Sequence, residues 1–417
     1  MDTAASETAA WDTAAWDTAL AEFIRAQTRR FRPWTLEAPL LIDTARIAWF
    51  AAAQGAMADF IEALVSNYPA LAPRLPQEPE VRDFLLSLDD MPFQPGTFRT
   101  DFVTDAAGRL ALIEITCRYP LNGFFTSMAL NSMVADHPLA TNRAFAFSDP
   151  MAGLPARFRR WMGANRRFVI VQGDDNRGNE SRHLKPLIEI AGLDFHHIPV
   201  RDWPAAADAL LPGSAILAEL DFDEWLSLPR ELVRRMMQRP LLNDPRLVFL
   251  AHDKAFFALA CDRDLVAGLL APKQAATLRQ ACALTVLPGT QPALWDDARR
   301  NPADWVLKPR HLGRSVDIRA GGLLDSRVWQ QSLDGAAERN MILQRWVPPR
   351  VFHGHLAGQP VADHIAGTLL FWGREFFGPG LFRSSSHPIT NVSDDRKLAY
   401  RVVTSHDRHA LPQLQWL

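Results

Sequence analysis

The chain has 417 residues, with 45 lysines and arginines against 47 aspartates and glutamates and a formal net charge of −2. A chain of this length predicts two or three domains rather than one. The near-balance of charge provides no overall attraction to nucleic acid or to an anionic membrane, so an anionic ligand would need a local group of basic residues.

The cysteines and the hydropathy pattern predict the cellular location of the protein. The three cysteines, Cys117, Cys261 and Cys282, are scattered and form no CxxC pair, which argues against a disulfide framework. No apolar run approaches the ~20 residues that a membrane span needs, and Met1–Asp17 lacks the basic and apolar parts of a signal peptide. We therefore expect a cytoplasmic protein with neither a membrane nor a nucleic-acid partner.

Residues 1–95 are expected to form an N-terminal helical region. The motif AAWDT occupies Ala9–Thr13 and again Ala14–Thr18, and we interpret this duplication as a helical or frayed extension, because two copies are too few for a repeat architecture. From Ala19 to about Leu88 the pattern is helical, and Ala45–Val65 carries alanine and long apolar residues at three- and four-residue spacing.

The segment Phe98–Ile115 predicts two strands joined by a tight turn. Side chains alternate along a strand, so two sets are each expected to share a face: Arg99, Asp101 and Val103 on one strand, and Leu112, Glu114 and Thr116 on the other. We assign residues 96–165 to this hairpin and its connecting helices.

Residues 166–242 have the spacing of a parallel α/β unit. Strands are expected at Arg167–Gln172, Leu193–Val200 and Ser214–Leu220, with a helix at His183–Ala191. The glycines after the first strand do not have the GxGxxG spacing, so no dinucleotide site is inferred. The polar loop Gly173–Ser181 follows a strand end, where open α/β sheets tend to bind ligands, and we expect an acceptor substrate there.

Residues 243–417 predict a mixed α+β region with antiparallel strands. We expect a helix over Asn243–Leu270 and strands at Asp304–Pro309, Ser315–Arg319 and Met341–Val347. A further hairpin is expected from His364–Trp372 and Glu375–Arg383, turning at Gly373.

Basic residues of this last region suit a phosphate ligand. Lys308 ends an apolar strand, from which a compact ammonium group can reach phosphate, and Gly313 in the next loop allows backbone N–H groups to approach it. Arg383 is followed by three serines, a set that suits a triphosphate. Taken singly, each also fits a structural role, such as a surface lysine for Lys308 or a solvated helix lysine for Lys254.

Asp101 and Glu114 lie on neighbouring strands of the expected hairpin. Two carboxylates a few ångströms apart repel each other unless a cation lies between them, and Mg²⁺ takes one or two carboxylates plus substrate phosphates. The same pair also fits the acid and base of a sugar-active hydrolase, or a surface aspartate beside a buried, paired glutamate.

The ordered set of motifs resembles the ATP-grasp superfamily. Five segments carry the resemblance: RTDFVTDAAGRLALIEITCRYPLNG, NDPRLVFLAHDK, WVLKPRHLGRSV, MILQRWV and GTLLFWGREFFGPGLFRSSSHPITN. The D…EIT hairpin precedes the lysines, which is similar to the circularly permuted branch that includes the glutathionylspermidine synthase-like ligases. The resemblance implies an α+β, circularly permuted ATP-grasp fold over roughly Phe98 to Asn391. Within it, 166–242 would be a parallel α/β pre-ATP-grasp-like domain and 243–417 the nucleotide-binding region.

The resemblance also implies roles for the residues at matching positions. ATP would contact Lys254, Lys308, Gly313, Arg314, Ser315, Gln344, Arg345, Trp346, Val347 and Asn391. Mg²⁺ would be held by Asp101, Glu114 and Thr116, where the threonine replaces the asparagine of the family and leaves a second magnesium open. Arg383 would contact the transferred phosphate, and Arg99 and Arg118 would face an acyl phosphate or a substrate carboxylate.

The implied activity is that of an ATP- and Mg²⁺-dependent carboxylate–amine ligase, which forms an amide or peptide bond through an acyl phosphate. Its partners would be small carboxylate and amine substrates, such as amino acids or a small peptide. The alternative is a nucleotide-binding regulatory protein with a degenerate form of the fold and no ligase activity, since EIT and a glycine-poor loop depart from the family pattern.

Overall fold

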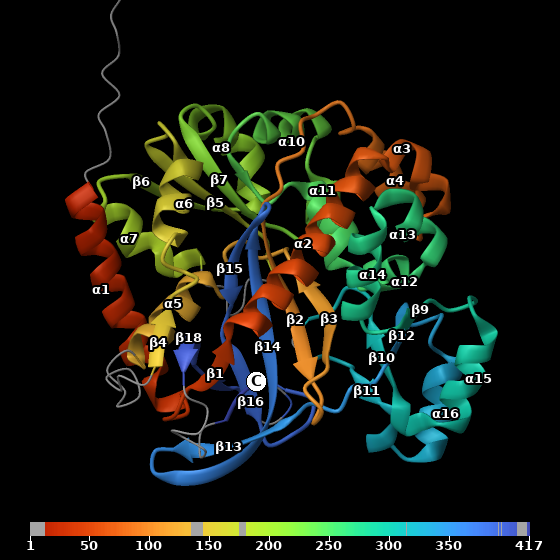
Figure 1. Cartoon of the computed structure of the whole chain (residues 1–417). Helices are drawn as coiled ribbons and strands as arrows, with labels where there is room; N and C mark the ends of the chain where they lie inside the picture. Colours follow the sequence, from red (N-terminus) through yellow and green to blue (C-terminus); the bar gives the residue numbers. More distant parts are fainter. Residues whose placement is uncertain are drawn as a thin grey trace, which may run out of the picture.

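The computed structural model describes residues 13–134, 145–174, 181–313, 315–390, 392, 394–406 and 415–417 of the chain. These residues form a mixed α/β structure with several sheets, as predicted (Figure 1). Figure 1 shows an antiparallel sheet in the middle, a parallel sheet above it, and a smaller antiparallel sheet to the lower right.

The central sheet has seven strands, with β17-β16-β14-β2-β3 as its main order and β13 and β15 also paired with β14. Its strands are β2 (Thr97–Thr104), β3 (Leu110–Thr116), β13 (Val351–Leu356), β14 (Gln359–Trp372), β15 (Glu375–Pro379), β16 (Phe382–Ser385) and β17 (Arg396–Leu398). The predicted hairpin at Phe98–Ile115 is confirmed as β2 and β3. The hairpin at Gly373 is also confirmed, but the expected strand Glu375–Arg383 is divided between β15 and β16.

A β-bulge in β3 changes the faces that its side chains occupy. Asp101 pairs with Glu114, whereas the next residue, Phe102, pairs with Leu112, so Ile113 is the extra residue. A bulge shifts the two-residue alternation by one position. Leu112 therefore lies in the core with Phe102, and the prediction that it shares a face with Glu114 is wrong. Ile113 instead joins Glu114 on the other face.

Helix α2 (Thr44–Ser66) covers one face of the central sheet (Figure 1). The side chain of Asp43 accepts a hydrogen bond from the backbone N–H of Arg46 and caps the start of this helix. Phe50 of α2 packs against Phe102, with 5.1 Å between the ring centroids. Because α2 occupies this face, the polar side chains of β2 and β3 are left on the opposite one.

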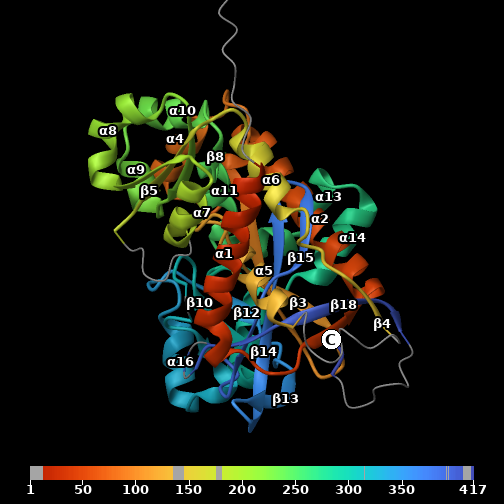
Figure 2. The same cartoon turned by 90° about the vertical axis from the view of Figure 1, so that its left-hand side faces the viewer.

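The opposite face is covered at one end by α5 (Phe124–Met133) and α1 (Thr13–Phe31), which lie alongside each other (Figure 2). Trp16 of α1 is fully buried and stacks on Phe158, at 5.5 Å between centroids. The second AAWDT copy thus belongs to a packed helix, while the first lies outside the described residues except for Thr13.

The N-terminal region also contains a strand, so the prediction of a helical pattern from Ala19 to about Leu88 is wrong at Leu40–Asp43 (β1). This strand pairs in parallel with β18 (Tyr400–His406), which also pairs with β4 (Phe145–Ser148). Three apolar residues are too short a run to reveal a strand, and the partner lies at the far end of the chain. The remaining helices of this region are α3 (Tyr68–Leu71) and α4 (Pro79–Leu86).

The predicted parallel α/β unit is confirmed. Its sheet has the order β6-β5-β7-β8, and its strand pairs are parallel. The strands are β5 (Arg167–Gln172), β6 (Asp194–Pro199), β7 (Ser214–Glu219) and β8 (Leu241–Leu242). The accompanying helices are α6 (Leu154–Met162), α7 (Lys185–Ile190), α8 (Trp203–Leu210), α9 (Phe222–Ser227) and α10 (Arg230–Met237).

The expected helix Asn243–Leu270 is a series of short helices. Its segments are α11 (Pro245–Leu247), a π-helical turn at Val248–His252, α12 (Ala255–Cys261) and α13 (Arg263–Leu269), followed by α14 (Pro272–Ala281). Lys254 stands at the break before α12 and is buried, so the reading of a solvated helix lysine is wrong. In the described part of the chain, no helix combines the length and apolarity that crossing a membrane requires.

The smaller antiparallel sheet has the order β11-β10-β12-β9. Its strands are β9 (Thr285–Val286), β10 (Trp305–Pro309), β11 (Arg319–Ala320) and β12 (Met341–Arg345), with helices α15 (Pro292–Arg300) and α16 (Ser326–Asp334) beside it. The expected strand Ser315–Arg319 is mostly a turn, because Ser315 and Asp317 have positive φ angles of 60° and 52° that no strand adopts. A core that includes Trp305 and Trp329 joins this sheet to its helices.

Candidate functional site

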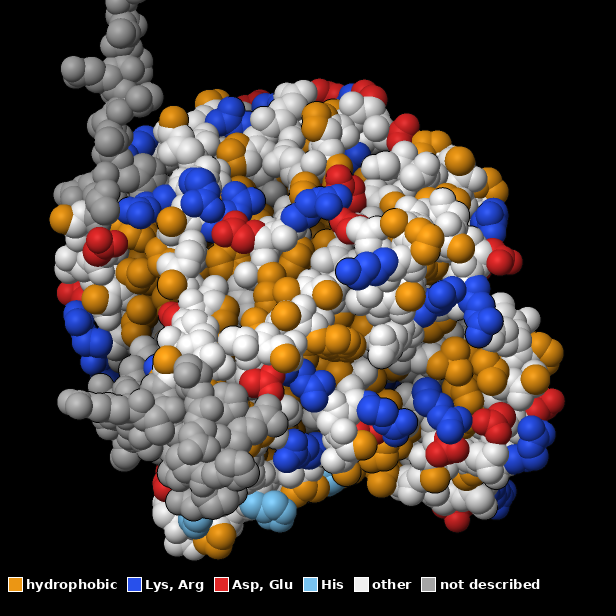
Figure 3. All heavy atoms as spheres, viewed as in Figure 1, with side chains coloured by type: hydrophobic (Ala, Val, Ile, Leu, Met, Phe, Trp, Pro, Cys, Tyr) orange, Lys and Arg blue, Asp and Glu red, His pale blue; other side chains and the backbone are white. Residues whose placement is uncertain are grey.

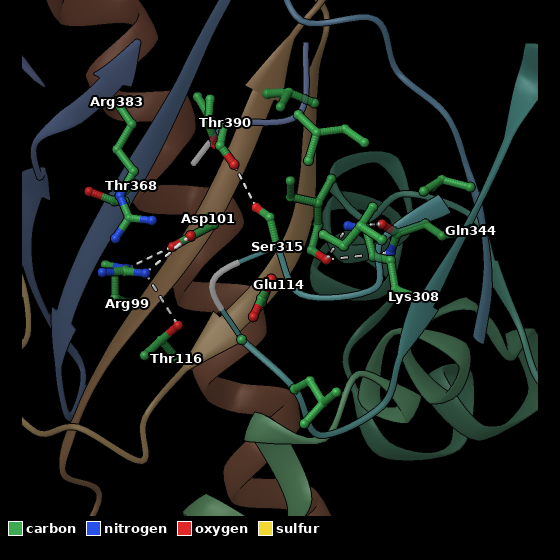
Figure 4. Close-up of a pocket in the computed structure, with 18 of the residues that line it drawn as sticks. Arg99, Asp101, Glu114, Thr116, Lys308, Ser315, Gln344, Thr368, Arg383 and Thr390 are labelled. Atoms are coloured by element: carbon green, nitrogen blue, oxygen red, sulfur yellow. Dashed lines mark hydrogen bonds and ion pairs between the residues drawn. The ribbon is translucent and has the colours of Figure 1, made fainter. Parts of the chain in front are cut away.

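A cavity of about 410 Å³ lies between the central sheet and the smaller sheet (Figure 4). Strands β2, β3, β14 and β16 line one side, and β10 and β12 line the other. It brings together most of the predicted site residues: Arg99, Asp101, Glu114, Thr116, Arg118, Lys308, Gly313, Ser315, Gln344, Arg345, Trp346, Val347 and Arg383. Arg314 and Asn391 lie outside the described residues.

Lys254 reaches the cavity through its contacts. Its Nζ lies 3.2 Å from Oε1 of Glu114 and donates a hydrogen bond of 2.6 Å to the carbonyl oxygen of Leu312, and both of these residues line the cavity. The lysine thereby ties the start of α12 to β3 and to the loop after β10.

Each of the two carboxylates has a cationic partner from the protein. Arg99 donates two hydrogen bonds to Asp101, from Nε to Oδ1 at 2.7 Å and from Nη2 to Oδ2 at 3.2 Å (Figure 4). Lys254 contacts Glu114 through one carboxylate oxygen, Oε1. The predicted closeness of Asp101 and Glu114 is confirmed by their pairing across β2 and β3. Arginine and lysine supply positive charge on either side of them.

The charge of Glu114 is stabilised by its surroundings. Burial alone would raise the pKa of this carboxyl group, but the positive charges of Lys254 and Lys308 outweigh burial and hold the pKa below its ordinary value. A catalytic acid of a sugar hydrolase needs a raised pKa. The hydrolase reading of Asp101 and Glu114 is therefore disfavoured.

One end of the cavity is a fixed polar edge. The Nζ of Lys308 donates to Oε1 of Gln344 at 2.7 Å, and Nε2 of Gln344 donates to Oγ1 of Thr285 at 2.9 Å. The Nζ also lies 3.4 Å from the carbonyl oxygen of Ile113, the bulge residue. Burial lowers the pKa of Lys308 to about 8, against the opposing effect of Glu114. The ammonium is thus charged at neutral pH but poorly hydrated.

The other end of the cavity carries arginines. Burial, together with the charge of Arg99, lowers the pKa of Arg383 from its ordinary value. Arg99 donates to Oδ1 of Asn122 and lies 3.4 Å from Oγ1 of Thr116. The hydroxyl proposed as a magnesium ligand therefore also lies beside an arginine.

Arg345 and Arg118 are engaged at the margins of the cavity. Arg345 contacts Asp304 at 3.0 Å and Asp297 at 3.5 Å, on the side of the smaller sheet. Arg118 lies 3.7 Å from Asp221 and over the ring of Tyr119. Neither arginine pairs with Asp101 or Glu114 in the contacts that the structure gives for these described residues.

The loop after β10 forms part of the cavity wall. Oγ of Ser315 donates a hydrogen bond of 2.6 Å to the carbonyl oxygen of Thr390, which joins this loop to the segment after β16 (Figure 4). A Cβ at Gly313 would meet no atom within 4 Å, so packing in this conformation does not require glycine there. The left-handed conformation of Ser315 has a backbone cost of the order of 1 kcal/mol, which its side-chain bond helps to offset.

Sequence reasoning missed several residues of the cavity. His252 precedes Lys254 by two positions, and burial, with help from Lys254, lowers its pKa to about 4, so it is neutral at pH 7. Thr368 pairs with Asp101 across β14 and β2. Thr368 could have been found from the sequence, because a threonine inside the apolar run of β14 indicates a polar position on that strand. His252 and Asn122 could not, because no periodic pattern of the sequence includes them.

A second cavity of about 420 Å³ adjoins the first. The two share Arg118, His252, His311 and Leu312. Stacked rings of Phe222 and Phe249 form part of the second wall, with 4.9 Å between centroids. The loop Gly173–Ser181, which we expected to hold an acceptor, lies largely outside the described residues.

Comparison with known proteins indicates a different family from the one that the motifs resemble. The family model of the AnkG N-terminal domain matches residues 53–250, which is less than half of the chain. This span contains the second half of α2, the β2–β3 hairpin and the parallel sheet, but not Lys308, Gln344 or Arg383. Among curated proteins, no match was found.

The family match corrects the inference from the ordered motifs. It is to the AnkG N-terminal domain and not to an ATP-grasp family, so the assignment to the ATP-grasp superfamily is wrong. The carboxylate–amine ligase activity and the alternative of a degenerate regulatory form were drawn from that assignment, and they are withdrawn with it. The separate motifs are short and of common types, so their order alone does not define a family. What remains is the cavity and its charges.

Proposed function

We propose that the chain binds a nucleoside triphosphate with Mg²⁺ in the 410 Å³ cavity and transfers its terminal phosphoryl group to an acceptor in the adjoining cavity. The observation that carries this proposal is an excess of positively charged side chains that are buried from water around the cavity. Four cations, Arg99, Lys254, Lys308 and Arg383, stand around Asp101 and Glu114, and a third carboxylate, Asp395, lies 3.9 Å from Arg383.

This excess of charge suits a polyanion rather than a neutral ligand. Interactions between charges are stronger where water is excluded, so a site in which cations outnumber carboxylates favours an anion that enters it. A triphosphate brings several negative charges at once and matches both lysine and arginine donors. During transfer, the same cations would stabilise negative charge on the phosphoryl group, which is the main contribution of proteins to this chemistry.

The polar edge at Lys308 and Gln344 suits the base of the nucleotide. Apolar side chains line the cavity beside this edge: Val103, Ile113, Val306, Ile318, Val347 and Ala366. A flat apolar slot next to fixed hydrogen-bonding groups is the usual form of a site for a heteroaromatic ring. The ring would lie at this end beside Gln344, with the phosphates extending from Lys308 toward Arg99 and Arg383.

The donor set of Asp101 and Glu114 fits a magnesium ion that arrives with phosphate. In the described residues, no group of three or more His, Cys, Asp or Glu side chains could hold a metal unaided. Mg²⁺ commonly takes one or two carboxylates and completes its shell with phosphate oxygens and water. Bound there, it would neutralise phosphate charge. Arg99 and Lys254 would then exchange their carboxylate contacts for contacts with phosphate.

Calorimetric titration of a non-hydrolysable ATP analogue with MgCl₂ tests the proposal. Lys308→Met keeps the length of the side chain and removes its charge, and we expect affinity to fall at least about tenfold, from the loss of one charged hydrogen bond. The matched control is Lys273→Met, at an exposed lysine of α14. Comparing adenosine, inorganic triphosphate and the analogue separates the base end from the phosphate end.

ADP formation from ATP, together with the appearance of the phosphoryl group on the acceptor, tests the transfer step, and free phosphate measures the competing hydrolysis. We expect ADP formation to rise when a suitable acceptor is added and to fall in Arg383→Gln. Absence of binding to every triphosphate, or equal affinity of Lys308→Met and wild type in folded samples, would overturn the proposal.

A further inference from the structure

A third cavity, of about 450 Å³, is lined by both of the cysteines that lie outside the central sheet region. Its wall consists of Cys261, Arg263, Arg279, Cys282 and Leu284, and none of these residues lines the proposed nucleotide cavity. Cys261 is the last residue of α12, and Cys282 follows the last residue of α14, beside β9 (Figure 1). The proposed function uses neither thiol.

The two cysteines line the same cavity with different access to solvent. Sγ of Cys261 lies 3.6 Å from the carbonyl oxygen of Ala283, the residue that follows Cys282. Cys261 is partly exposed, whereas Cys282 is buried. A reagent in the cavity would therefore reach Cys261 more readily than Cys282.

The positive charge of the cavity wall favours anionic reagents over neutral ones. Arg263 and Arg279 are exposed, and the lining contains no carboxylate. Asp262 and Asp264 are nearby in sequence, but they cap and begin α13 and do not line the cavity. Two guanidinium groups attract an anionic reagent and hold it near the thiols.

We propose that Cys261 and Cys282 form a thiol–disulfide exchange site that takes an anionic disulfide of low molecular weight. The thiolate of Cys261 attacks one sulfur of the reagent, the reagent's S–S bond breaks, and one small thiolate leaves and takes up a proton. Cys282 then attacks Sγ of Cys261 and releases the second small thiol. The protein loses two thiol hydrogens and gains one disulfide, while the reagent is reduced to two thiols.

The buried setting of the thiols determines how this reaction depends on pH. Burial raises the pKa of both thiols, so the thiolate fraction is small at neutral pH and grows toward alkaline pH. The exchange is therefore expected to accelerate as pH rises, which distinguishes it from an acidic, highly reactive cysteine.

The segment after Cys282 connects this site to the nucleotide cavity. The N–H of Ala283 donates to the carbonyl oxygen of Leu112 on β3, and the carbonyl oxygen of Leu284 accepts from the N–H of Arg345 on β12. Thr285 accepts the hydrogen bond from Gln344. Closing a disulfide at Cys282 therefore acts on the segment that positions Gln344 and, through it, Lys308.

The experiment compares two chromogenic disulfides, anionic dithiobis(nitrobenzoate) and neutral dithiodipyridine, on the whole folded protein. We expect release of two small thiols per chain and a Cys261–Cys282 cross-linked peptide by mass spectrometry. Cys282→Ser should stop at a mixed disulfide on Cys261, and Cys261→Ser should leave Cys282 unmodified. The buried Cys117 is an internal control.

Charge selection is tested with Arg263→Gln and Arg279→Gln. These exposed substitutions should slow the anionic reagent several-fold and leave the neutral one unchanged. Hydrogen exchange of the Cys282–Val286 segment should differ between reduced and oxidised protein. Failure to form the cross-link in folded protein, labelling of Cys117 at the same rate, or equal slowing of both reagents would overturn the proposal. These outcomes do not depend on nucleotide binding.

Discussion

The Nζ of Lys254 and Oε1 of Glu114 lie 3.2 Å apart, although the residues come from distant parts of the chain. Lys254 is 2% exposed and stands before α12, and Glu114 follows the bulge of β3. The pair joins the helical layer to the central sheet on the floor of the cavity. Since both groups are largely withdrawn from water, Glu114 depends on Lys254, together with Lys308, for compensation of its charge.

Removal of one partner of this pair should destabilise the fold. We expect Lys254→Met to lower the free energy of unfolding by about 3 kcal/mol, because Glu114 would keep a poorly hydrated charge. Glu114→Gln combined with Lys254→Met should cost less than the sum of the single changes. Urea unfolding measures both. Lys185→Met, at the exposed pair with Glu189, is the control and should change stability by less than about 1 kcal/mol. Additive single effects would contradict this view.

The buried His252 should make the protein sensitive to acid. Its pKa is lowered from 6.5 to about 4, first by burial and then by Lys254. The unfolded chain takes up a proton below about pH 6.5, whereas the folded chain does not until about pH 4, so stability is lost as pH falls through this window. The loss amounts to about 3 kcal/mol at most.

The measurement for His252 is the free energy of unfolding at several pH values between 7 and about 4. His252→Gln should lose less stability than wild type over this range, since the amide does not titrate. His353→Gln, at an exposed histidine of β13, should follow wild type. Parallel curves for wild type and His252→Gln would rule out this role.

The pKa of Lys308 predicts the pH dependence of nucleotide affinity. Burial lowers this pKa to about 8, so the ammonium is charged at pH 7 and loses its proton as pH rises through 8. A bound polyanion favours the charged form, and its affinity should therefore fall between pH 7 and about pH 9. Calorimetric titration across this range should give a decline for wild type and a flatter curve for Lys308→Met. A rise in wild-type affinity would contradict the assignment of Lys308 to the nucleotide.

Trp16 should be a main anchor of α1. It is fully buried and stacks on Phe158, so we expect Trp16→Ala to lower the free energy of unfolding by about 3–5 kcal/mol. Trp34 is 61% exposed, and Trp34→Ala should change stability by less than about 0.5 kcal/mol. Thermal unfolding of the two variants compares the same substitution at a buried and an exposed site. Similar stabilities would show that α1 contributes little to the fold.

On the face shown in Figure 3, basic side chains form several separate groups, with acidic and apolar side chains between them. This distribution agrees with the net charge of −2 and with the expectation that an anion is held by local groups. In the site, those groups come from β2, β10, β16 and the start of α12. The composition excludes a strong electrostatic field from the net charge of the chain. It does not show which lysines and arginines come together at the cavity.

The amino-acid sequence by itself determined the local elements with a clear period or turn. Alternation and the AAG turn predicted β2 and β3, and short apolar runs predicted the parallel strands β5, β6 and β7. The same patterns placed Asp101 and Glu114 on adjacent strands, because a tight turn leaves little freedom in strand pairing. These features depend on residues that are close together in the chain.

The tertiary structure alone decided the features that depend on distant segments. The bulge at Ile113 moves Leu112 into the core, and β1 is a strand because β18 from the other end of the chain pairs with it. Lys254 is buried against the cavity residues Glu114 and Leu312, and not solvated, because the start of α12 packs beside β3. Local patterns record which face of an element is apolar. The partner of that face is chosen by packing among segments that the sequence does not place side by side.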